Sequence, residues 1–450
     1  MFFSVNPYTG ERIAQYKALS DRGIQDALEL SVEAGKIWRK ETVNARAALL
    51  LNTAEILRED KERFALMITQ EMGKPITESR AEVDKCAWVC EYYAENAAIY
   101  LEDEFVQTDA QRSYIRKQPL GLILAIMPWN FPFWQVFRFA APTLTAGNTA
   151  LLKHAANVMG CAEMIEEIFM KAGYPAGVFQ NLCINHEQVN DLLSNPVVKA
   201  VSLTGSERAG VAIATQAGKY VKKCLLELGG NNAFIVLKDA DIDLTVQTAV
   251  KARMLNTGQS CIAAKRFIVV DAIYDEFVYA FTEALKELKY GNPEDESTDY
   301  GPMARADLAE ALQNQMLASI AQGAKLVLGG KQEATMHEIS LLTEVKPGMP
   351  AFDEETFGPL VAVIRAKDEQ EAIKLAQETK YGLGLSIFSR DVKAAEGLVD
   401  QFEDGAVFIN ALVKSDPRLP FGGTKLSGYG RELAKEGIFE FVNLQTVYIN

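Results

Sequence analysis

The chain has 450 residues, which is more than one hydrophobic core normally organises, so two or three structural units are expected. Its 60 acidic and 46 basic residues give a net charge of −14, which argues against binding nucleic acid or an anionic membrane through bulk attraction. No apolar run reaches the roughly 18 residues of a membrane-spanning helix, and 6 cysteines without paired spacing and 3 scattered histidines suggest no metal site. We therefore predict a cytoplasmic protein that binds no metal, nucleic acid or membrane.

The first hundred residues are predicted to be helical. From residue 21 to about residue 104, apolar side chains recur with a period near 3.6. Gly73-Lys74-Pro75 interrupts this pattern and predicts two long helices. The short apolar run 121–127, which ends at Pro128, then predicts a buried strand.

Strands and helices alternate from this point onward. The first predicted set has strands at 148–153, 198–203 and 233–237 and helices at 161–172 and 210–220. The second set, in a unit that begins near residue 230, has strands at 266–270, 360–365, 385–389 and 406–410 and helices at 244–254, 274–288, 304–322, 369–378 and 392–402. This alternation is typical of parallel sheets covered by helices and favours a nucleotide-binding fold. The polar segment 329–347 is assigned no element.

One cysteine stands apart from the other five. Cys261 follows the small, polar run Asn256-Thr257-Gly258-Gln259-Ser260, which predicts a loop that lifts a side chain into a cleft. A lone cysteine is more often a small buried apolar residue, and that is our interpretation of the others. Glu227 lies upstream in Glu227-Leu228-Gly229-Gly230, and a carboxylate there suits a base for the thiol or for a hydrolytic water. The pair indicates acyl chemistry on a carbonyl.

Three strand ends carry further candidates. Asn130 follows the strand 121–127 between two prolines, and its amide is either a turn cap or a donor to a developing oxyanion. Gly205 and Ser206 lie between a strand and a helix, where free backbone N–H groups can bind a diphosphate or simply form an ordinary turn. Lys153 closes another strand, where its ammonium could reach a ribose or a phosphate, although lysines there are usually solvated.

Taken in order, these segments resemble the aldehyde dehydrogenase superfamily. The matching motifs are Pro128-Trp129-Asn130, Glu227-Leu228-Gly229-Gly230, Gly258-Gln259-Ser260-Cys261, Glu355-Thr356-Phe357-Gly358-Pro359 and Pro420-Phe421-Gly422-Gly423. The resemblance implies an α/β fold with a Rossmann-type nucleotide-binding domain (1–105 and 121–229), an α/β catalytic domain (230–430) and a small β oligomerisation element (106–120 and 431–450). A homodimer or homotetramer is therefore expected.

The resemblance also implies roles for single residues. Cys261 is expected to be the nucleophile, Glu227 the general base, and the Asn130 side chain with the Cys261 N–H the oxyanion hole. The expected cofactor contacts are Trp129, Lys153, Ala156, Gly205, Ser206, Glu355 and Phe357. In the implied reaction the aldehyde forms a thiohemiacetal on Cys261, hydride leaves to the nicotinamide, and water activated by Glu227 opens the thioester.

Substrate and cofactor follow from finer similarities. The stretch around Lys414-Ser415-Asp416-Pro417-Arg418 is similar to that of the bacterial succinate-semialdehyde dehydrogenase group. Members of this group bind the substrate carboxylate with an arginine and a serine, which Arg138 and Ser415 match. Arg418 is a further candidate. Leu255 departs from the group, because some of its members have an arginine at this position.

Cofactor choice rests on Ala156, which stands where enzymes strict for NAD commonly have a glutamate that repels a 2′-phosphate. NADP or NAD is therefore expected. Segment 329–342 also departs from the family, without a predicted consequence. The alternatives are a dehydrogenase for another short aldehyde, an enzyme that acylates coenzyme A through the same thioester, and a non-catalytic relative that keeps only the scaffold.

Overall fold

The computed structural model describes all 450 residues and begins with a hairpin and four helices. These elements are β1 (Phe2–Val5), β2 (Arg12–Tyr16), α1 (Asp21–Trp38), α2 (Val43–Glu59), α3 (Lys61–Met72) and α4 (Ile76–Tyr100). The prediction of two long helices is wrong, although Gly73 does end a helix with a positive φ of 82°. Thr42 caps α2 by accepting the N–H of Ala45, and Asp60 separates α2 from α3, so local capping divides the first stretch into three.

The first sheet is parallel except at one edge. Its order is β21-β9-β8-β5-β6-β7, with β5 (Leu122–Met127), β6 (Thr149–His154), β7 (Phe179–Asn181), β8 (Val198–Thr204), β9 (Lys223–Glu227) and β21 (Gly428–Tyr429). The accompanying helices are α5 (Trp134–Thr145), α6 (Met159–Lys171), α7 (His186–Ser194) and α8 (Glu207–Lys219). The central β5 is followed on one side by β6 and β7 and on the other by β8 and β9, which is the doubly wound order. The order in which strands are added to the sheet therefore reverses between the parallel neighbours β5 and β8, and ligands bind at this point in such sheets.

The second sheet has the order β12-β15-β16-β11-β10-β18-β19 and is parallel except for β12. Its strands are β10 (Asn232–Val236), β11 (Ala264–Val270), β12 (Lys325–Leu328), β15 (Ser340–Thr343), β16 (Leu360–Ala366), β18 (Leu385–Phe388) and β19 (Val407–Ile409). Its helices are α9 (Ile242–Met254), α10 (Tyr274–Lys286), α11 (Ala306–Ala321), α12 (Pro350–Asp353), α13 (Glu369–Gln377) and α14 (Val392–Glu396). The predicted strands 266–270, 360–365, 385–389 and 406–410 are confirmed to within two residues.

Two differences concern the ends and gaps of this unit. The predicted helix 392–402 is too long, because α14 ends at Glu396 and a 3-10 turn follows at Val399–Gln401. The unassigned segment 329–347 contains a small hairpin, β13 (Gln332–Glu333) and β14 (Met336–His337), and then β15. Elements of two to four residues are too short to show a hydrophobic period.

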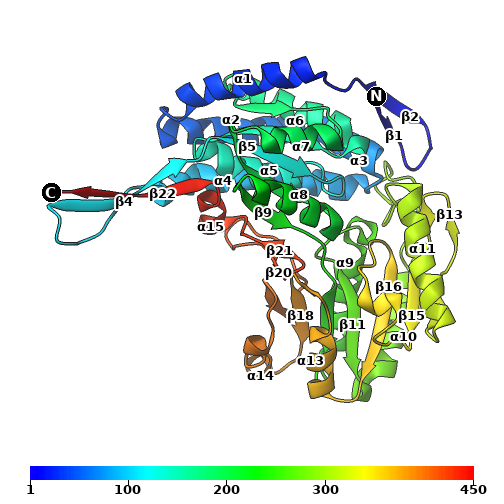
Figure 1. The fold of residues 1–450 in the computed structure, drawn as a ribbon. Coiled ribbons are helices and arrows are strands. Elements are labelled where there is room, and N and C mark those ends of the chain that lie inside the picture. The colour runs from blue at the N-terminus through cyan, green and yellow to red at the C-terminus, as the bar shows by residue number, and fades with distance from the viewer.

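An arm projects from the body of the molecule and ends at the C-terminus (Figure 1). It is a sheet of order β22-β4-β3, built from β3 (Glu104–Phe105), β4 (Arg112–Pro119) and β22 (Val442–Ile449). The strands β4 and β22 are antiparallel from Arg112 opposite Ile449 to Pro119 opposite Val442. Helix α15 (Ala434–Phe439) leads into β22. After the second sheet the chain thus returns to the first sheet, since β21 also pairs with β9.

No helix of the structure is both long enough and apolar enough to cross a membrane.

Candidate active site

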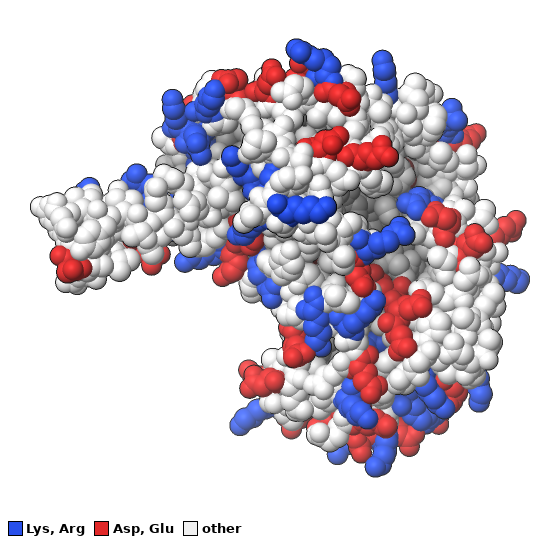
Figure 2. All heavy atoms as spheres, in the orientation of Figure 1, with Lys and Arg blue, Asp and Glu red and all other residues white.

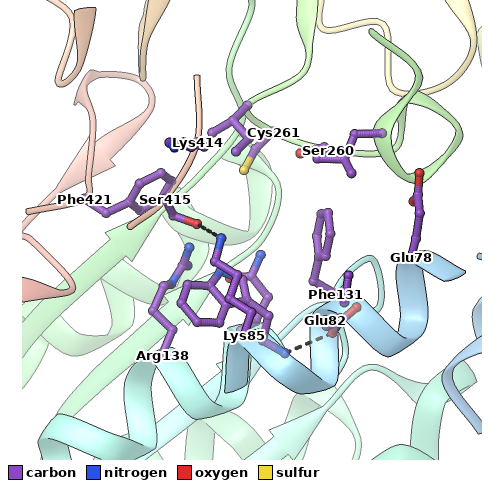
Figure 3. A pocket seen from close by; sticks show the side chains of 15 residues that line it. Glu78, Glu82, Lys85, Phe131, Arg138, Ser260, Cys261, Lys414, Ser415 and Phe421 are labelled. Carbon is purple, nitrogen blue, oxygen red and sulfur yellow. Dashed lines mark hydrogen bonds between the residues drawn. The ribbon is translucent and has the colours of Figure 1, made fainter. Parts of the chain in front are cut away.

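Two cavities meet at Cys261. One, of about 250 Å³, lies at the carboxyl ends of the first sheet's strands, and we call it the strand-end cavity. The other, of about 170 Å³, is lined largely by α4, α5 and the loop that contains Ser415, and we call it the helix-face cavity (Figure 3). Cys261 lines both, whereas four of the other five cysteines are buried and Cys183 lines neither. The predicted nucleophile is therefore the cysteine that faces open space.

The loop that carries Cys261 has an unusual backbone. Asn256, Thr257 and Gly258 follow one another with φ values of 58°, 54° and 73°. A Cβ on Gly258 would lie 2.4 Å from the carbonyl oxygen of Gly358, so only glycine fits there. Residues other than glycine seldom adopt a positive φ, so surrounding contacts must stabilise Asn256 and Thr257 in this conformation.

Buried hydrogen bonds supply those contacts. The Asn256 side chain donates to the carbonyl oxygens of Asn130 (2.7 Å) and Gln259 (3.0 Å), and its backbone N–H donates to Glu78 (2.8 Å). The ammonium of Lys265 donates to the carbonyl oxygens of Ser260 (2.8 Å) and Cys261 (2.7 Å). The nucleophile is thus fixed from both sides of its loop.

The thiol of Cys261 is held in its neutral form in this state of the protein. Burial raises its pKa to about 11, against the opposing effect of the Lys265 and Arg138 cations. Formation of the reactive thiolate therefore requires a base or a further nearby positive charge.

Asn130 lies beside Cys261 in the wall of the strand-end cavity. Its side-chain amide donates one hydrogen bond, to the carbonyl oxygen of Gln259 at 3.1 Å, and so keeps a second N–H available. The backbone N–H of Cys261 donates to no protein acceptor. These two free donors are what a developing oxyanion at this point would need.

Glu227 is the last residue of β9, and its carboxylate lies outside the lining of both cavities. Its Oε1 has no hydrogen-bond partner and would lie 2.8 Å from a Cβ on Gly422, so glycine makes room for it. Burial raises the pKa of Glu227 well above the ordinary range, and the nearby charge of Glu432 raises it further. Its charge is still close enough to raise the pKa of Cys261.

Most of the predicted cofactor residues line the strand-end cavity, namely Trp129, Gly205, Ser206, Glu355 and Phe357. The Trp129 and Phe357 rings meet edge to face, with centroids 5.8 Å apart. Ser206 caps α8 by accepting the N–H of Ala209 at 3.3 Å, which leaves its hydroxyl hydrogen free. The cavity therefore combines apolar walls with a helix N-terminus, a combination that suits a nucleotide.

Glu355 is held firmly in this wall. Its carboxylate accepts the N–H of Gly230 at 3.0 Å and pairs with the buried ammonium of Lys265 at 3.1 Å. A Cβ on Gly229 would lie 2.4 Å from Glu355 Oε2. The Gly229-Gly230 pair therefore lets the carboxylate approach the backbone closely.

Lys153 and Ala156 lie farther along, at the end of β6 and at the start of the 3-10 turn Ala156–Val158. The Lys153 ammonium has neither a hydrogen-bond partner nor an ion-pair partner, and burial lowers its pKa. Ala156 is exposed and contributes no charge of its own. Neither residue lines the strand-end cavity itself.

In the helix-face cavity, the structure brings together two of the three predicted substrate residues (Figure 3). Arg138 is buried, forms an ion pair with Glu432, donates to Thr204 Oγ1 at 3.2 Å and lies over the Phe421 ring. Ser415 Oγ accepts a hydrogen bond from Lys85 at 2.7 Å.

Arg418 does not reach this cavity, because it pairs with Asp416 at 2.7 Å and its guanidinium lies 5.4 Å from the Trp88 ring.

Sequence reasoning missed three residues of the site: Lys85, Glu432 and Lys265. Lys85 lies on the same face of α4 as Glu78 and Glu82, at a spacing of four and then three residues. Such a charged helix face is usually solvated, so the pattern did not indicate a cavity wall.

The comparisons decide the family. A model of the Aldehyde dehydrogenase family matches residues 2–447. The chain belongs to this family. It is 46% identical over 449 residues, or 99% of each chain, to a probable succinate-semialdehyde dehydrogenase [NADP(+)] of Synechocystis sp.. It is also 46% identical over 448 residues to the succinate semialdehyde dehydrogenase [NAD(P)+] Sad of Escherichia coli, and this match covers 99% of the chain and 97% of that relative.

A solved structure gives the same result. The succinic semialdehyde dehydrogenase of Streptococcus pyogenes, determined in complex with NADP+, superposes with a TM-score of 0.98 at 39% identity and covers all of both chains. The predicted family and α/β fold class are confirmed, and the chain is an NAD(P)-dependent aldehyde dehydrogenase. The roles of single residues and the domain boundaries stay predictions.

Proposed function

We propose that this aldehyde dehydrogenase oxidises succinate semialdehyde, or a closely similar short anionic aldehyde, to the carboxylic acid. The observation that carries the proposal is the position of Cys261 between a cavity suited to a nucleotide and a second cavity lined by the cationic residues Lys85, Arg138 and Lys414. The names of the bacterial relatives and of the superposed structure support the same substrate class.

In the first step, Cys261 attacks the aldehyde. Glu227 in its ionised form takes the thiol proton, and the thiolate then bonds to the carbonyl carbon to give a thiohemiacetal. The free N–H groups of Asn130 and Cys261 stabilise the oxyanion, each by about 3–4 kcal/mol if they act like similar donors.

NADP or NAD supplies the acceptor for the hydride that leaves the thiohemiacetal carbon. Trp129, Phe357, Gly205 and Ser206 would hold it in the strand-end cavity, with Glu355 on the ribose next to the reacting ring. The cradle that Gly229 leaves beside Glu355 fits this assignment, because any larger residue would displace the carboxylate.

Hydrolysis completes the reaction. Glu227, once it has released the first proton to solvent, removes a proton from a water that attacks the Cys261 thioester and frees the acid. Because its carboxylate lies against Gly422 in this structure, its side chain must rotate toward Cys261 for this step. A carboxylate with this role favours a free acid over transfer to coenzyme A.

For the cofactor, we propose that the enzyme accepts NADP and can also use NAD. The Lys153 ammonium has no partner within the protein, and Ala156 contributes no carboxylate that would repel a 2′-phosphate. The NADP named for several relatives supports this choice.

A homodimer or homotetramer formed through the arm is also proposed. β22 is an edge strand whose free side could pair with another strand, and large apolar side chains on the arm are exposed, namely Phe105, Val106, Leu444 and Tyr448. Most of the arm surface seen in Figure 2 is uncharged. Light scattering of the wild type and of Leu444→Asp tests the assignment, and an unchanged mass would argue against it.

The test of function compares succinate semialdehyde with butanal, each with NADP and with NAD. We expect reduced nicotinamide and succinate with the semialdehyde, no signal from Cys261→Ala, and full activity from Cys224→Ala, which removes a cysteine away from both cavities. Equal efficiency on butanal would favour another short aldehyde. Binding of cofactor without turnover of any aldehyde would favour a scaffold protein, and an acyl-coenzyme A product would favour transfer.

A further inference from the structure

Lys85 is a cation of the helix-face cavity that no motif pointed to. It lies on α4 with Glu78 and Glu82, and all three side chains line this cavity (Figure 3). Its ammonium lies 4.3 Å from the centroid of the Trp134 ring, and Figure 3 shows it beside Arg138 and below Ser415. The side chain is therefore directed into the space that Cys261 faces.

The other buried charges of this wall already have partners. Glu82 accepts the backbone N–H groups of Phe133 and Trp134, each at 2.9 Å, and pairs with the buried Lys74. Arg138 pairs with Glu432. These groups are committed to the fold, so their charge is largely balanced before any ligand arrives.

Lys85 is different, because it has no carboxylate partner within ion-pair distance. Burial and, to a smaller extent, the positive charge of Arg138 lower its pKa to about 8, so the ammonium is poorly compensated where it stands. A partly desolvated cation without a counter-ion favours an anionic ligand.

The hydrogen bond from Lys85 to Ser415 determines which donors these two residues can offer a ligand. An ammonium can only donate, so in the 2.7 Å contact Ser415 Oγ is the acceptor and its own hydrogen stays free. No other hydrogen bond of Ser415 Oγ is present in the structure. Lys85 and Ser415 thus offer two adjacent donors to one oxygen-bearing group.

The size of the cavity agrees with a small ligand. A dry cavity of about 150 Å³ can hold benzene, so about 170 Å³ can hold a four-carbon semialdehyde. Leu255 and Phe131 supply apolar walls for its methylene groups, and the exposed Lys414 adds a third cation at the rim.

We propose that Lys85 is a specificity-determining residue that, together with Ser415, binds the remote carboxylate of the anionic aldehyde. The inference rests on the proposed function and adds to it the residue whose uncompensated charge selects the substrate. Arg138 lines the same cavity, but its charge is already paired with Glu432, whereas that of Lys85 is not.

The experiment measures kcat/KM for succinate semialdehyde and for butanal in the wild type and in Lys85→Met, which keeps length and apolar contact but removes the charge. The ratio of the two values should fall roughly 10- to 100-fold, which is the usual effect of losing a hydrogen bond to a charged group. The loss should reside mainly in KM for the semialdehyde. Lys85→Arg should recover part of the ratio, since it restores the cation.

Two matched lysines separate this role from general electrostatics. Lys414→Met removes an exposed cation of the same cavity and should lower the ratio only a few-fold, with a stronger dependence on salt. Lys393→Met lies on exposed α14, away from the cavity, and should leave both rates unchanged. Succinate inhibition gives a second measure that does not require turnover, and its inhibition constant should rise with Lys85→Met in the same proportion.

The outcomes distinguish the two proposals. A wild type that prefers the semialdehyde together with a Lys85→Met enzyme that keeps this preference would overturn the role of Lys85 alone. A wild type without any preference for the charged aldehyde would overturn the proposed substrate and this role with it. Equal losses on both aldehydes in Lys85→Met, with a lowered melting temperature, would assign Lys85 a purely structural role.

Discussion

The two cavities that meet at Cys261 are built in different ways. The strand-end cavity is formed mainly by loops that follow β5, β8 and β9, and its polar lining includes Asn130, Ser206 and one carboxylate, Glu355. The helix-face cavity is formed by side chains of α4, α5 and the loop around Ser415. Its charged lining consists of the cations Lys85, Arg138 and Lys414 and the carboxylates Glu78 and Glu82. The first suits a ligand common to many enzymes, and the second suits one particular aldehyde.

This difference indicates where specificity can change without loss of the reaction. Side chains of a helix face can be replaced one at a time, whereas glycines and strand ends that bring the backbone near a ligand cannot. Substitutions that act on Cys261 itself, on one cavity or on the other should therefore give separable kinetic effects.

The largest separable effect is expected from Glu227, which lines neither cavity. In Glu227→Gln, the Cys261 thiol can lose its proton only to water, so hydride transfer should still occur once but more slowly, since the aldehyde and the cofactor are bound as before. Water activation is lost, so the steady-state rate should fall about 10²- to 10⁴-fold while a burst of reduced nicotinamide remains. Rapid-mixing absorbance and mass spectrometry of the acylated Cys261 measure this, and a variant without a burst would contradict it.

Loss of the Asn130 side chain should slow the reaction equally for charged and for neutral aldehydes. Asn130→Ala removes one of two oxyanion donors, so kcat should fall about 10²- to 10³-fold. Because the donor acts on the carbonyl, the fall should be equal for succinate semialdehyde and for butanal. A loss confined to the charged aldehyde would show that Asn130 belongs functionally to the helix-face cavity instead.

The same contrast explains what the sequence alone could predict. The parallel strands of both sheets showed as apolar runs, and Asn130, Ser206 and Cys261 stand just after such runs or in glycine-containing loops, so their positions could be inferred locally. The strand-end cavity is a consequence of that local order, since parallel strands bring their carboxyl ends to one edge.

The helix-face cavity required the tertiary structure. Lys85 and Ser415 are 330 positions apart, and neither the helical period nor any spacing relates them. For the same reason no local pattern links Glu432 to Arg138, and none indicates that α4 and α5 face one another through Glu82. The apolar period runs on through caps such as Thr42, so it predicts two N-terminal helices where the structure has four.

Gly229 offers a change confined to the strand-end cavity. In Gly229→Ala the new Cβ would lie 2.4 Å from Glu355 Oε2, so the carboxylate must move or the backbone must shift, at a cost of about 1–3 kcal/mol. We expect KM for NADP to rise roughly 5- to 100-fold while the ratio between charged and neutral aldehydes stays the same.

Gly218→Ala is the matched control for this change. Gly218 lies in α8, where a Cβ meets nothing within 4 Å, so the substitution should leave KM unchanged and slightly stabilise the helix. A changed aldehyde ratio in Gly229→Ala would mean that the two cavities are coupled.

The smallest expected effect is that of pH on the binding of succinate in the helix-face cavity. The pKa of Lys85 is lowered to about 8, so the ammonium is charged at pH 7 and mostly neutral at pH 9. Succinate keeps both carboxylates ionised over this range, and its affinity should follow the charged fraction of Lys85. The inhibition constant of succinate should therefore be about tenfold higher at pH 9 than at pH 7.

Other charges face Lys85, and their titration must be separated from its own. Glu78 has a pKa raised to about 7 by burial, and its ionisation above pH 7 would also weaken the binding of an anion. Glu82, Arg138 and Asp416 also act on Lys85. Lys85→Arg resolves the contributions, because a guanidinium does not titrate below pH 12 and any remaining dependence then belongs to Glu78. If the tenfold change persists in Lys85→Arg, the loss of affinity at high pH does not come from Lys85, and the contrast between the two cavities loses its electrostatic basis.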